Sequence, residues 1–170
     1  MKKAHFAGGC FWCITPTFKE TAGVQDVTCG YCGGDEANPT YEQVKHGETH
    51  HRETIQVTYD EERVSFGELL ALFLDSVDPF DGGGQFIDRG ASYTLAVYFA
   101  DEAERKETEA QLARLSQASG RAPQVAVEPL KVFYPAEEYH QDYYLKNPEA
   151  FEEELRTSGR VAACKLRRKK

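Results

Sequence analysis

Two thiols, two large aromatic side chains and two glycines occupy six consecutive positions, Gly8 to Cys13, near the start of the chain. Cys10 directly follows the glycine pair, at the start of a predicted helix. The free N–H groups of a first helical turn and the helix dipole stabilise negative charge. A thiolate is the reactive form of cysteine, so this position predicts a nucleophile. If Cys10 is exposed, Phe11 and Trp12 cannot both be core residues, and at least one of them should line a pocket beside the sulfur.

The spacing of this first cysteine pair recurs further along the chain. Two residues separate Cys10 from Cys13, and two residues separate Cys29 from Cys32. Such a repeat is typical of a four-cysteine zinc site. The two aromatic residues inside the first pair are bulky for the turn between zinc ligands, and a predicted helix separates the pairs. We therefore expect no metal here, and zinc binding remains an alternative hypothesis.

A strand, a Cys-x-x-Cys pair and a helix in that order are also typical of thioredoxin-like dithiol oxidoreductases. The doubled aromatic between the two thiols is unusual for that class and favours a substrate pocket. With Cys164 the chain has five cysteines. In the reducing cytoplasmic compartment that we expect, an odd count argues against a static disulfide framework and favours redox chemistry, metal binding or both.

Composition indicates a soluble globular protein, with 41% hydrophobic and 28% charged residues. The 170 residues fit one catalytic domain, residues 1–170, which ends in a basic tail over about 157–170. The net charge is −8, and five of the 20 basic residues lie within 165–170. The acidic remainder repels nucleic acid and anionic membranes, so we expect neither as a partner. We also expect no signal peptide or membrane span.

The hydrophobic pattern predicts interleaved strands and helices. We expect strands over 5–7, 24–29, 54–59, 93–99 and 125–130, helices over 11–20, 65–76, 102–117, 136–145 and 148–156, and loops over 30–40 and 78–90. Ser65 and Glu68 have capping-box spacing at one helix start, and Asp101 caps another. This order predicts an α/β or α+β fold with helices packed on one main sheet. It resembles a split βαβ plait more than a Rossmann fold.

Several polar residues stand next to predicted strands, where functional sites collect. Glu53 immediately precedes one strand, and Asp88 and Tyr93 flank the start of the next. Tyr41 follows a loop with an Asn-Pro break. Each of them, taken singly, also fits a solvated strand end, a turn or half-buried packing.

Longer motifs give the chain a family resemblance. They are Phe6-Ala7-Gly8-Gly9-Cys10-Phe11-Trp12, Gly30-Tyr31-x-Gly33-Gly34, Asn38-Pro39-Thr40-Tyr41-Glu42-x-Val44, His51-x-Glu53, Asp78-Pro79, Asp88-Arg89-Gly90 with Tyr93, and Phe133-Tyr134-Pro135-Ala136-Glu137-x-Tyr139-His140-Gln141. Over nearly its whole length the chain resembles peptide methionine sulfoxide reductases of the A type, which act on the S epimer of methionine sulfoxide. The resemblance implies an α+β fold: a two-layer sandwich related to the ferredoxin-like plait, with a mixed sheet and flanking helices.

The resemblance also implies a role for each candidate residue. Cys10 would be the nucleophile, and Phe11 and Trp12 would hold the ε-methyl group of the substrate. Glu53 would be the acid at the sulfoxide oxygen, since this oxygen leaves poorly until it is protonated. The remaining polar residues would assist there: Tyr41 and Tyr93 as hydrogen-bond donors, and Asp88 as the organiser of the polar side of the pocket.

Turnover would leave a sulfenic acid on Cys10, which a second thiol converts to a disulfide. Cys13 lies one helical turn away and is our first choice for this resolving thiol; Cys164 is the second. Cys29 and Cys32 are possible relays of oxidation. Thioredoxin would then reduce the disulfide by exchange, with no cofactor.

Overall fold

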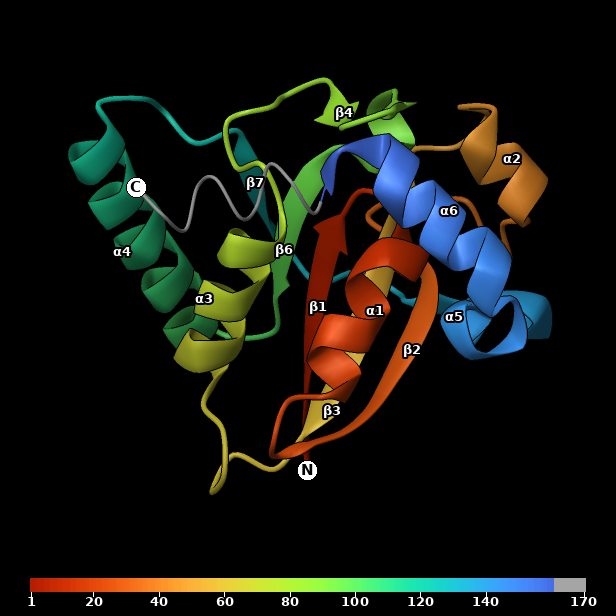
Figure 1. Ribbon diagram of the computed structural model, residues 1–170. Coiled ribbons are helices and arrows are strands. Elements are labelled where there is room, and N and C mark those ends of the chain that lie inside the picture. Colours follow the sequence, from red (N-terminus) through yellow and green to blue (C-terminus); the bar gives the residue numbers. More distant parts are fainter. Residues whose placement is uncertain (161–170) are drawn as a thin grey trace.

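The structure is a computed structural model, and it describes residues 1–160. Its strands are β1 (Lys2–Gly8), β2 (Val24–Cys32), β3 (Arg52–Tyr59), β4 (Gly84–Gln85), β5 (Asp88–Arg89), β6 (Leu95–Phe99), β7 (Val125–Pro129) and β8 (Tyr134–Pro135). Six of them form one mixed sheet in the order β7-β6-β1-β3-β2-β8 (Figure 1). The β6–β7 pair is parallel and the other neighbours are antiparallel. The strands β4 and β5 make a separate hairpin.

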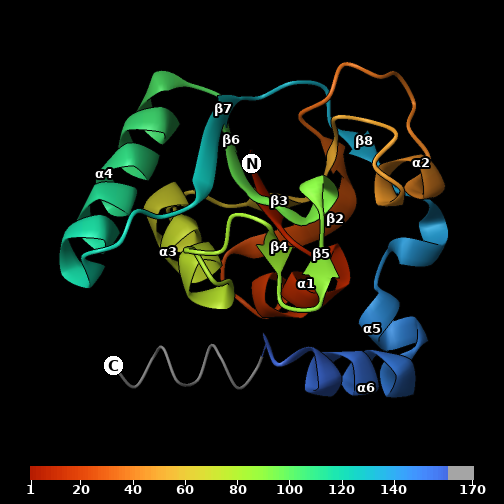
Figure 2. The ribbon, with the colours of Figure 1, turned by 90° about the horizontal axis from the view of Figure 1, so that it is seen from above.

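The helices are α1 (Phe11–Lys19), α2 (Tyr41–Lys45), α3 (Phe66–Ser76), α4 (Glu102–Ser119), α5 (Tyr143–Lys146) and α6 (Pro148–Ser158), with 3-10 turns η1 (Ala91–Tyr93) and η2 (Glu138–His140). α1 and α3 cover one face of the sheet, and α4 lies beside α3 near β6 and β7 (Figures 1 and 2). α6 lies outside α1 (Figure 2). The fold is therefore α+β, a mixed sheet with flanking helices. Among the described helices none has both the length and the apolar character needed to cross a bilayer.

Alternation along the strands sends side chains to two unequal cores. On the helix side, Phe6 of β1 stacks on Phe73 of α3 with ring centroids 5.0 Å apart. On the opposite face, Ala7 belongs to a smaller cluster that Leu130 and Phe133 cover. The segment that joins β7 to β8 thus closes the sheet face that none of the described helices covers (Figure 2).

The local signals in the sequence locate several element ends correctly. The Ser65 hydroxyl accepts a hydrogen bond from the Glu68 amide at 3.0 Å, and both halves of this capping box are present at the start of α3. Asp101 caps α4 in the same way, and Gly120 ends it in a left-handed conformation. These ends depend on contacts within one turn, which a sequence pattern can reveal.

Other expected boundaries are wrong. β2 continues to Cys32 rather than giving way to a loop at residue 30, because it pairs with β3 along its whole length and with β8 at its end. The helix expected over 136–145 is interrupted, since Gln141 is extended and Asp142 has φ 54°. The loop expected over 78–90 contains the β4–β5 hairpin, and the strand expected from residue 93 begins at Leu95 after η1.

The end of the described chain also differs from expectation. α6 runs through Ser158, and Arg160 is buried with its guanidinium donating to the Ser76 and Gly8 carbonyls. Of residues 157–160, where we expected the tail to begin, Ser158 and Arg160 are therefore buried, whereas Thr157 and Gly159 are exposed. Cys164 and the basic residues of 165–170 lie outside the described residues.

One turn at the end of β1 brings the chemistry to the sheet. β1 ends at Gly8, and Gly9 has φ 83°, which only glycine adopts without strain. The chain then enters α1 with Cys10 as its N-cap. A Cβ on Gly9 would lie 2.7 Å from Cβ of the buried Gln85, so the turn is also closely packed.

We predict that Gly9→Ala destabilises the protein more than a change in backbone conformation alone explains. Gly47 is a matched control, since it has φ 73° and no atom lies within 4 Å of the place that a Cβ would take there. Gly47→Ala should cost about 1 kcal/mol for the left-handed conformation. Gly9→Ala should cost about 1–3 kcal/mol more, because the added methyl group clashes with Gln85. Urea unfolding under reducing conditions measures both, and equal losses would contradict the packing argument.

Candidate active site

Cys10 and Cys13 form the centre of the site. Cys10 is 5% exposed, and no side-chain capping hydrogen bond occupies it. The Cys13 amide donates to the Cys10 carbonyl at 3.1 Å, which closes the first turn of α1. Hydrogen bonding with the Cys13 side chain is the largest influence on the Cys10 pKa, and no disulfide joins the two cysteines. The two thiols, one helical turn apart, are therefore neighbours in the site.

The protonation state of Cys10 differs from the thiolate that its helix N-terminus favours. The hydrogen bond to Cys13, burial and the negative charges of Glu53 and Asp88 together raise the Cys10 pKa well above its usual value. These effects outweigh the helix dipole, whose contribution is at most about 2 kcal/mol. In this state Cys10 is a thiol, and an attack on an electrophile must include the loss of its proton.

Glu53 lies behind the nucleophile at the start of β3 and is 1% exposed. Its Oε1 accepts the Phe11 amide at 3.2 Å. Burial raises the Glu53 pKa to about 8, although the Phe11 hydrogen bond opposes this shift and the charge of Asp88 adds to it. The carboxyl group is consequently protonated at neutral pH and able to act as an acid beside a thiol.

Two phenols lie near this carboxyl group. Tyr93 acts on Glu53 as a hydrogen-bond donor, which opposes the rise of the Glu53 pKa. Burial and the negative charge of Glu53 raise the pKa of Tyr93 and that of Tyr41, and the charge of Cys10 adds to both shifts. Both phenols thus remain protonated donors over the whole physiological range. The structure brings together the residues that the sequence singled out separately at positions 10, 41, 53 and 93.

Asp88 of β5 lies beside the thiol, together with a residue that the sequence pattern did not single out. The ligand atoms of Cys10, Asp88 and Glu154 all lie within 4.8 Å of one another. Burial raises the pKa of Asp88 and of Glu154, and in Glu154 the charge of Asp88 adds to the effect. Glu154 comes from α6, a helix whose position over α1 no local sequence pattern reveals.

Aromatic rings form the wall on the α1 side. Trp12 stacks on Tyr143 at 3.9 Å between centroids, and its indole N–H donates to His140 Nδ1 at 3.1 Å. Phe11 packs in the main core, 5.2 Å from the His140 ring and 6.0 Å from Tyr31. Trp12 is only partly buried, so of the two aromatic residues Phe11 is the core residue and Trp12 the rim residue.

The segment Ala136–Gln141 orients this wall, and sequence reasoning assigned it no role. The Glu137 carboxylate accepts the Tyr31 hydroxyl at 2.8 Å and the Tyr41 amide at 3.0 Å. Burial opposes its ionisation, but these hydrogen bonds outweigh burial and lower the Glu137 pKa. The Gln141 side chain bonds the Cys29 amide and carbonyl, both at 2.9 Å, on the free edge of β2. The signal available in the sequence was that polar residues occur at every turn of the helix predicted over 136–145.

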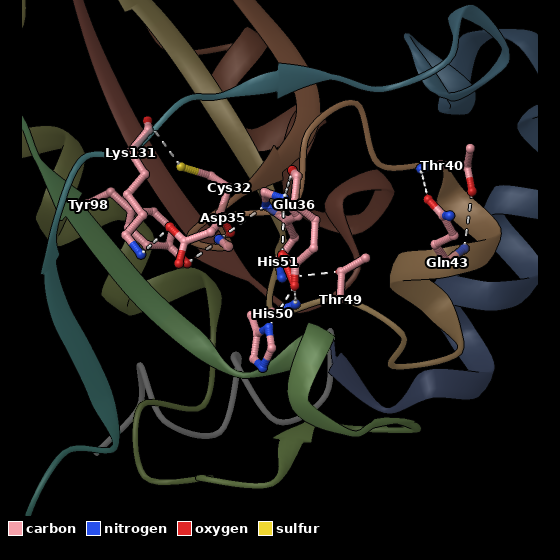
Figure 3. Close-up of polar contacts among 11 residues, drawn as sticks. Cys32, Asp35, Glu36, Thr40, Gln43, Thr49, His50, His51, Tyr98 and Lys131 are labelled. Carbon is pink, nitrogen blue, oxygen red and sulfur yellow. Dashed lines mark hydrogen bonds and ion pairs between the residues drawn. The ribbon is translucent and has the colours of Figure 1, made fainter.

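The loop before Tyr41 is fixed by its own polar contacts (Figure 3). Thr40 and Gln43 form a capping box at the start of α2, with bonds of 3.0 and 3.3 Å. Glu36 accepts the His50 amide at 2.9 Å, and the His51 ring bonds the Glu36 carbonyl at 2.8 Å. Since residues 50–51 lead directly into β3, these bonds connect the loop that carries Tyr41 to the strand that carries Glu53.

The arrangement of the thiols contradicts a four-cysteine zinc site. Cys29 is in the main core beside Thr15, with Sγ 3.4 Å from Oγ1, whereas Cys32 is in the cluster on the opposite face of the sheet (Figure 3). Burial raises the Cys29 pKa to about 12 and the Cys32 pKa to about 11. Four thiols on two faces of a sheet cannot bind one ion, and neither Cys29 nor Cys32 is hydrogen-bonded to the Cys10–Cys13 pair.

Comparison with known proteins gives one family. A model described as peptide methionine sulfoxide reductase matches residues 2–169. The chain is 43% identical over 159 residues to peptide methionine sulfoxide reductase MsrA of Bacillus licheniformis, covering 92% of this chain and 88% of that protein. It is 44% identical over 161 residues to peptide methionine sulfoxide reductase MsrA 2 of Staphylococcus aureus, covering 94% and 91%.

Solved structures have the same fold. Reduced Mxr1 from Saccharomyces cerevisiae superposes with a TM-score of 0.81 at 30% identity, over 87% of this chain and 86% of that chain. Mxr1 in complex with Trx2 superposes with a TM-score of 0.57 at 21% identity, over 82% and 83%. The second likeness shows the fold alone.

Proposed function

Because the chain belongs to the peptide methionine sulfoxide reductase family, we propose that it reduces the S epimer of methionine sulfoxide in proteins to methionine. The observation that carries this proposal is the protonated Glu53 carboxyl group buried beside the Cys10 thiol. A sulfoxide oxygen must be protonated before sulfur–oxygen cleavage, and a carboxyl group with a pKa of about 8 holds that proton at neutral pH.

The first half-reaction joins the nucleophile to the acid. The Cys10 sulfur loses its proton and attacks the substrate sulfur, while Glu53 protonates the sulfoxide oxygen. The oxygen passes to Cys10, so that one thiol and one sulfoxide become one sulfenic acid and one thioether. The proton lost by the thiol replaces the one that Glu53 donates. Substrate sulfur is reduced and Cys10 is oxidised.

The remaining pocket residues select and stabilise the substrate. Tyr41 and Tyr93 donate to the sulfoxide oxygen as its negative charge grows. Asp88 organises the polar side of the pocket. Phe11 and Trp12 form the pocket for the ε-methyl group: Trp12, which is only partly buried, is within reach of a substrate, and Phe11 supports it from the core. Fixing oxygen and methyl group at once makes the pocket chiral, and this accounts for the choice of one epimer.

The second half-reaction regenerates the thiol. Cys13 attacks the Cys10 sulfenic acid, which forms a disulfide and releases water. Its hydrogen bond to Cys10 favours it over Cys164, which is our second choice. Cys29 and Cys32 are buried apart from this pair, which argues against a relay role for either. Thioredoxin then reduces the disulfide by exchange; Mxr1, whose reduced form is 30% identical to this chain, has been solved in complex with Trx2.

Two broader properties belong to the same proposal. The antiparallel order β6-β1-β3-β2, with α1 between β1 and β2 and α3 between β3 and β6, supports a ferredoxin-like plait as the core of the fold.

A cytoplasmic location is supported by the four described cysteines, all of which are free.

Separated S and R epimers of a peptide methionine sulfoxide test the function directly. With dithiothreitol as reductant, we expect turnover of the S epimer alone, since only this epimer can place its methyl group and its oxygen correctly. Chromatographic measurement of methionine formation gives both rates. Equal turnover of the two epimers, or turnover of neither, would refute the proposal.

Glu53→Gln should reduce kcat on the order of 10²-fold or more, because the amide keeps the shape of the side chain but has no acidic proton. Wild-type activity should decline above pH 8, where the carboxyl group ionises, and remain on the acidic side of that value. Tyr41→Phe and Tyr93→Phe are the comparison variants. Each should lose less than Glu53→Gln, since one phenol remains, and near-normal turnover by Glu53→Gln would remove it from the mechanism.

Cys13→Ser should complete one turnover but fail to cycle with thioredoxin. Peptide mapping after a single turnover of the wild type without reductant should show Cys10 bonded to Cys13, since the two thiols are neighbours in the site. Cys164→Ser is the matched control and should cycle normally. The reverse outcome, with Cys164→Ser stalled and Cys13→Ser active, would make the later cysteine the resolving thiol.

A further inference from the structure

Beyond the end of β1, the sheet lacks its central strand. β1 lies between β3 and β6, and its last paired residue, Gly8, is opposite Leu95. The chain then turns away into α1, whereas β3 extends past this level to Arg52, which pairs with Cys32 on its other side. On the β6 side, Thr94 immediately precedes the strand. Within residues 1–160, no backbone ladder therefore connects β3 to the start of β6 at the level of the site.

The Arg52 side chain bridges this gap. Its Nε donates to Thr94 Oγ1 at 2.8 Å, and Nη1 donates to the Tyr98 hydroxyl at 3.0 Å and to Glu128 Oε2 at 3.2 Å. The Thr94 hydroxyl in turn donates to the Ala91 carbonyl at 2.7 Å, within η1. The hydrogen bonds of one guanidinium group thus connect β3 to β6 where no strand lies between them, and they fix the turn that precedes β6.

Tyr98 extends the bridge to the neighbouring strand. Its hydroxyl donates to the Cys32 carbonyl at 3.2 Å, and Cys32 is the residue that pairs with Arg52 (Figure 3). Arg52 is therefore held from β2, β6 and β7 at once. Charged donors make stronger hydrogen bonds than neutral ones. The Glu128 side chain is 40% exposed, so its ion pair contributes little.

The two residues joined by this bridge are the sequence neighbours of two site residues. Arg52 precedes Glu53 and Thr94 follows Tyr93. Glu53 reaches the site on the helix side of the sheet, whereas Arg52 binds Tyr98, which belongs to the cluster on the opposite face. The bond between Arg52 and Thr94 on one face therefore sets the separation of Glu53 and Tyr93 on the other.

We propose that Arg52 is a positioning residue for sulfoxide reduction, which holds the Tyr93 hydroxyl against Glu53 through its hydrogen bond to Thr94. The inference rests on the proposed function and assigns Arg52 no contact with the substrate. Two experimental results are therefore required. Loss of the bridge must impair the chemical step rather than substrate binding, and the impairment must act through Tyr93.

Arg52→Met keeps the length of the side chain and removes all three hydrogen bonds. With peptide methionine S-sulfoxide and dithiothreitol, we expect kcat to fall on the order of tenfold with KM unchanged, below the ~10²-fold loss that a displacement of 1 Å in a catalytic group can cause. Glu128→Gln is the matched control: it keeps an acceptor for Nη1, removes only the ion pair, and should leave kcat unchanged. Urea unfolding shows whether Arg52→Met is still folded.

Thr94 provides a second, smaller test if Arg52→Met unfolds. Thr94→Val removes the acceptor at nearly constant volume and should lower kcat as Arg52→Met does. Thr94→Ser keeps the hydroxyl and should restore kcat. Normal kcat in Thr94→Val, or an equal loss in both variants, would refute the bridge.

A double variant decides whether Arg52 acts through Tyr93. In a Tyr93→Phe background, Arg52→Met should cause no further loss of kcat, because the hydroxyl that it positions is already absent. If the losses of kcat in the two single variants multiply in the double variant, the proposal is contradicted and Arg52 has only a general structural role. The wild-type enzyme distinguishes a failure of the proposed function from a failure of the Arg52 proposal. If the wild type fails to reduce the S epimer, the proposed function is wrong. If the wild type is active and the variants are unaffected, only the role of Arg52 is refuted.

Discussion

The burial of one carboxyl group governs this site. Glu53 is 1% exposed, and an ionised carboxylate at such a position is costly, so its proton is retained to a pH of about 8. The Phe11 amide binds Oε1 and fixes the orientation of the group. A carboxyl group in water would be ionised at neutral pH and would offer no proton to a substrate oxygen. The same burial and the neighbouring acids also keep Cys10 a thiol.

The fold supplies this environment by ending its central strand early. β1 stops at Gly8, and the positive φ of Gly9 returns the chain over the sheet, so that the N-terminus of α1 covers the start of β3. Cys10 thereby lies above Glu53 rather than at a solvent-exposed helix end. The opening left in the sheet is bridged by Arg52 from the opposite face.

Sequence reasoning succeeded where the cause is local. The capping box of Ser65 and Glu68 and the αL end of α4 at Gly120 lie within one helical turn of the boundaries that they define. Cys10 could be proposed as the nucleophile for the same reason, since a cysteine after two glycines at a helix start needs no distant partner, and this role stays a prediction. Grouping Glu53 with Tyr93 and Tyr41 required the family resemblance, because nothing local joins residues so far apart in sequence.

It failed where distant side chains decide the outcome. The interrupted helix around Gln141 follows from two bonds to Cys29, 112 positions away in the sequence. We expected Cys10 to be a thiolate. Instead Cys13, burial and two acidic residues raise its pKa and together outweigh the helix dipole, so that Cys10 is a thiol. Glu154 and Arg52 carry no motif at all, and their proximity to the site results from the packing of α6 and from the gap beside β1.

The protonation of Glu53 is the central claim, and infrared difference spectroscopy between the wild type and Glu53→Gln measures it most directly. A protonated carboxyl group has a carbonyl stretching band that a carboxylate lacks. We predict that this band is present at pH 7 in the reduced enzyme and disappears with a midpoint near pH 8. A band that disappears near the ordinary glutamate value of 4.5 would show an ionised Glu53 at neutral pH and would contradict its role as the acid.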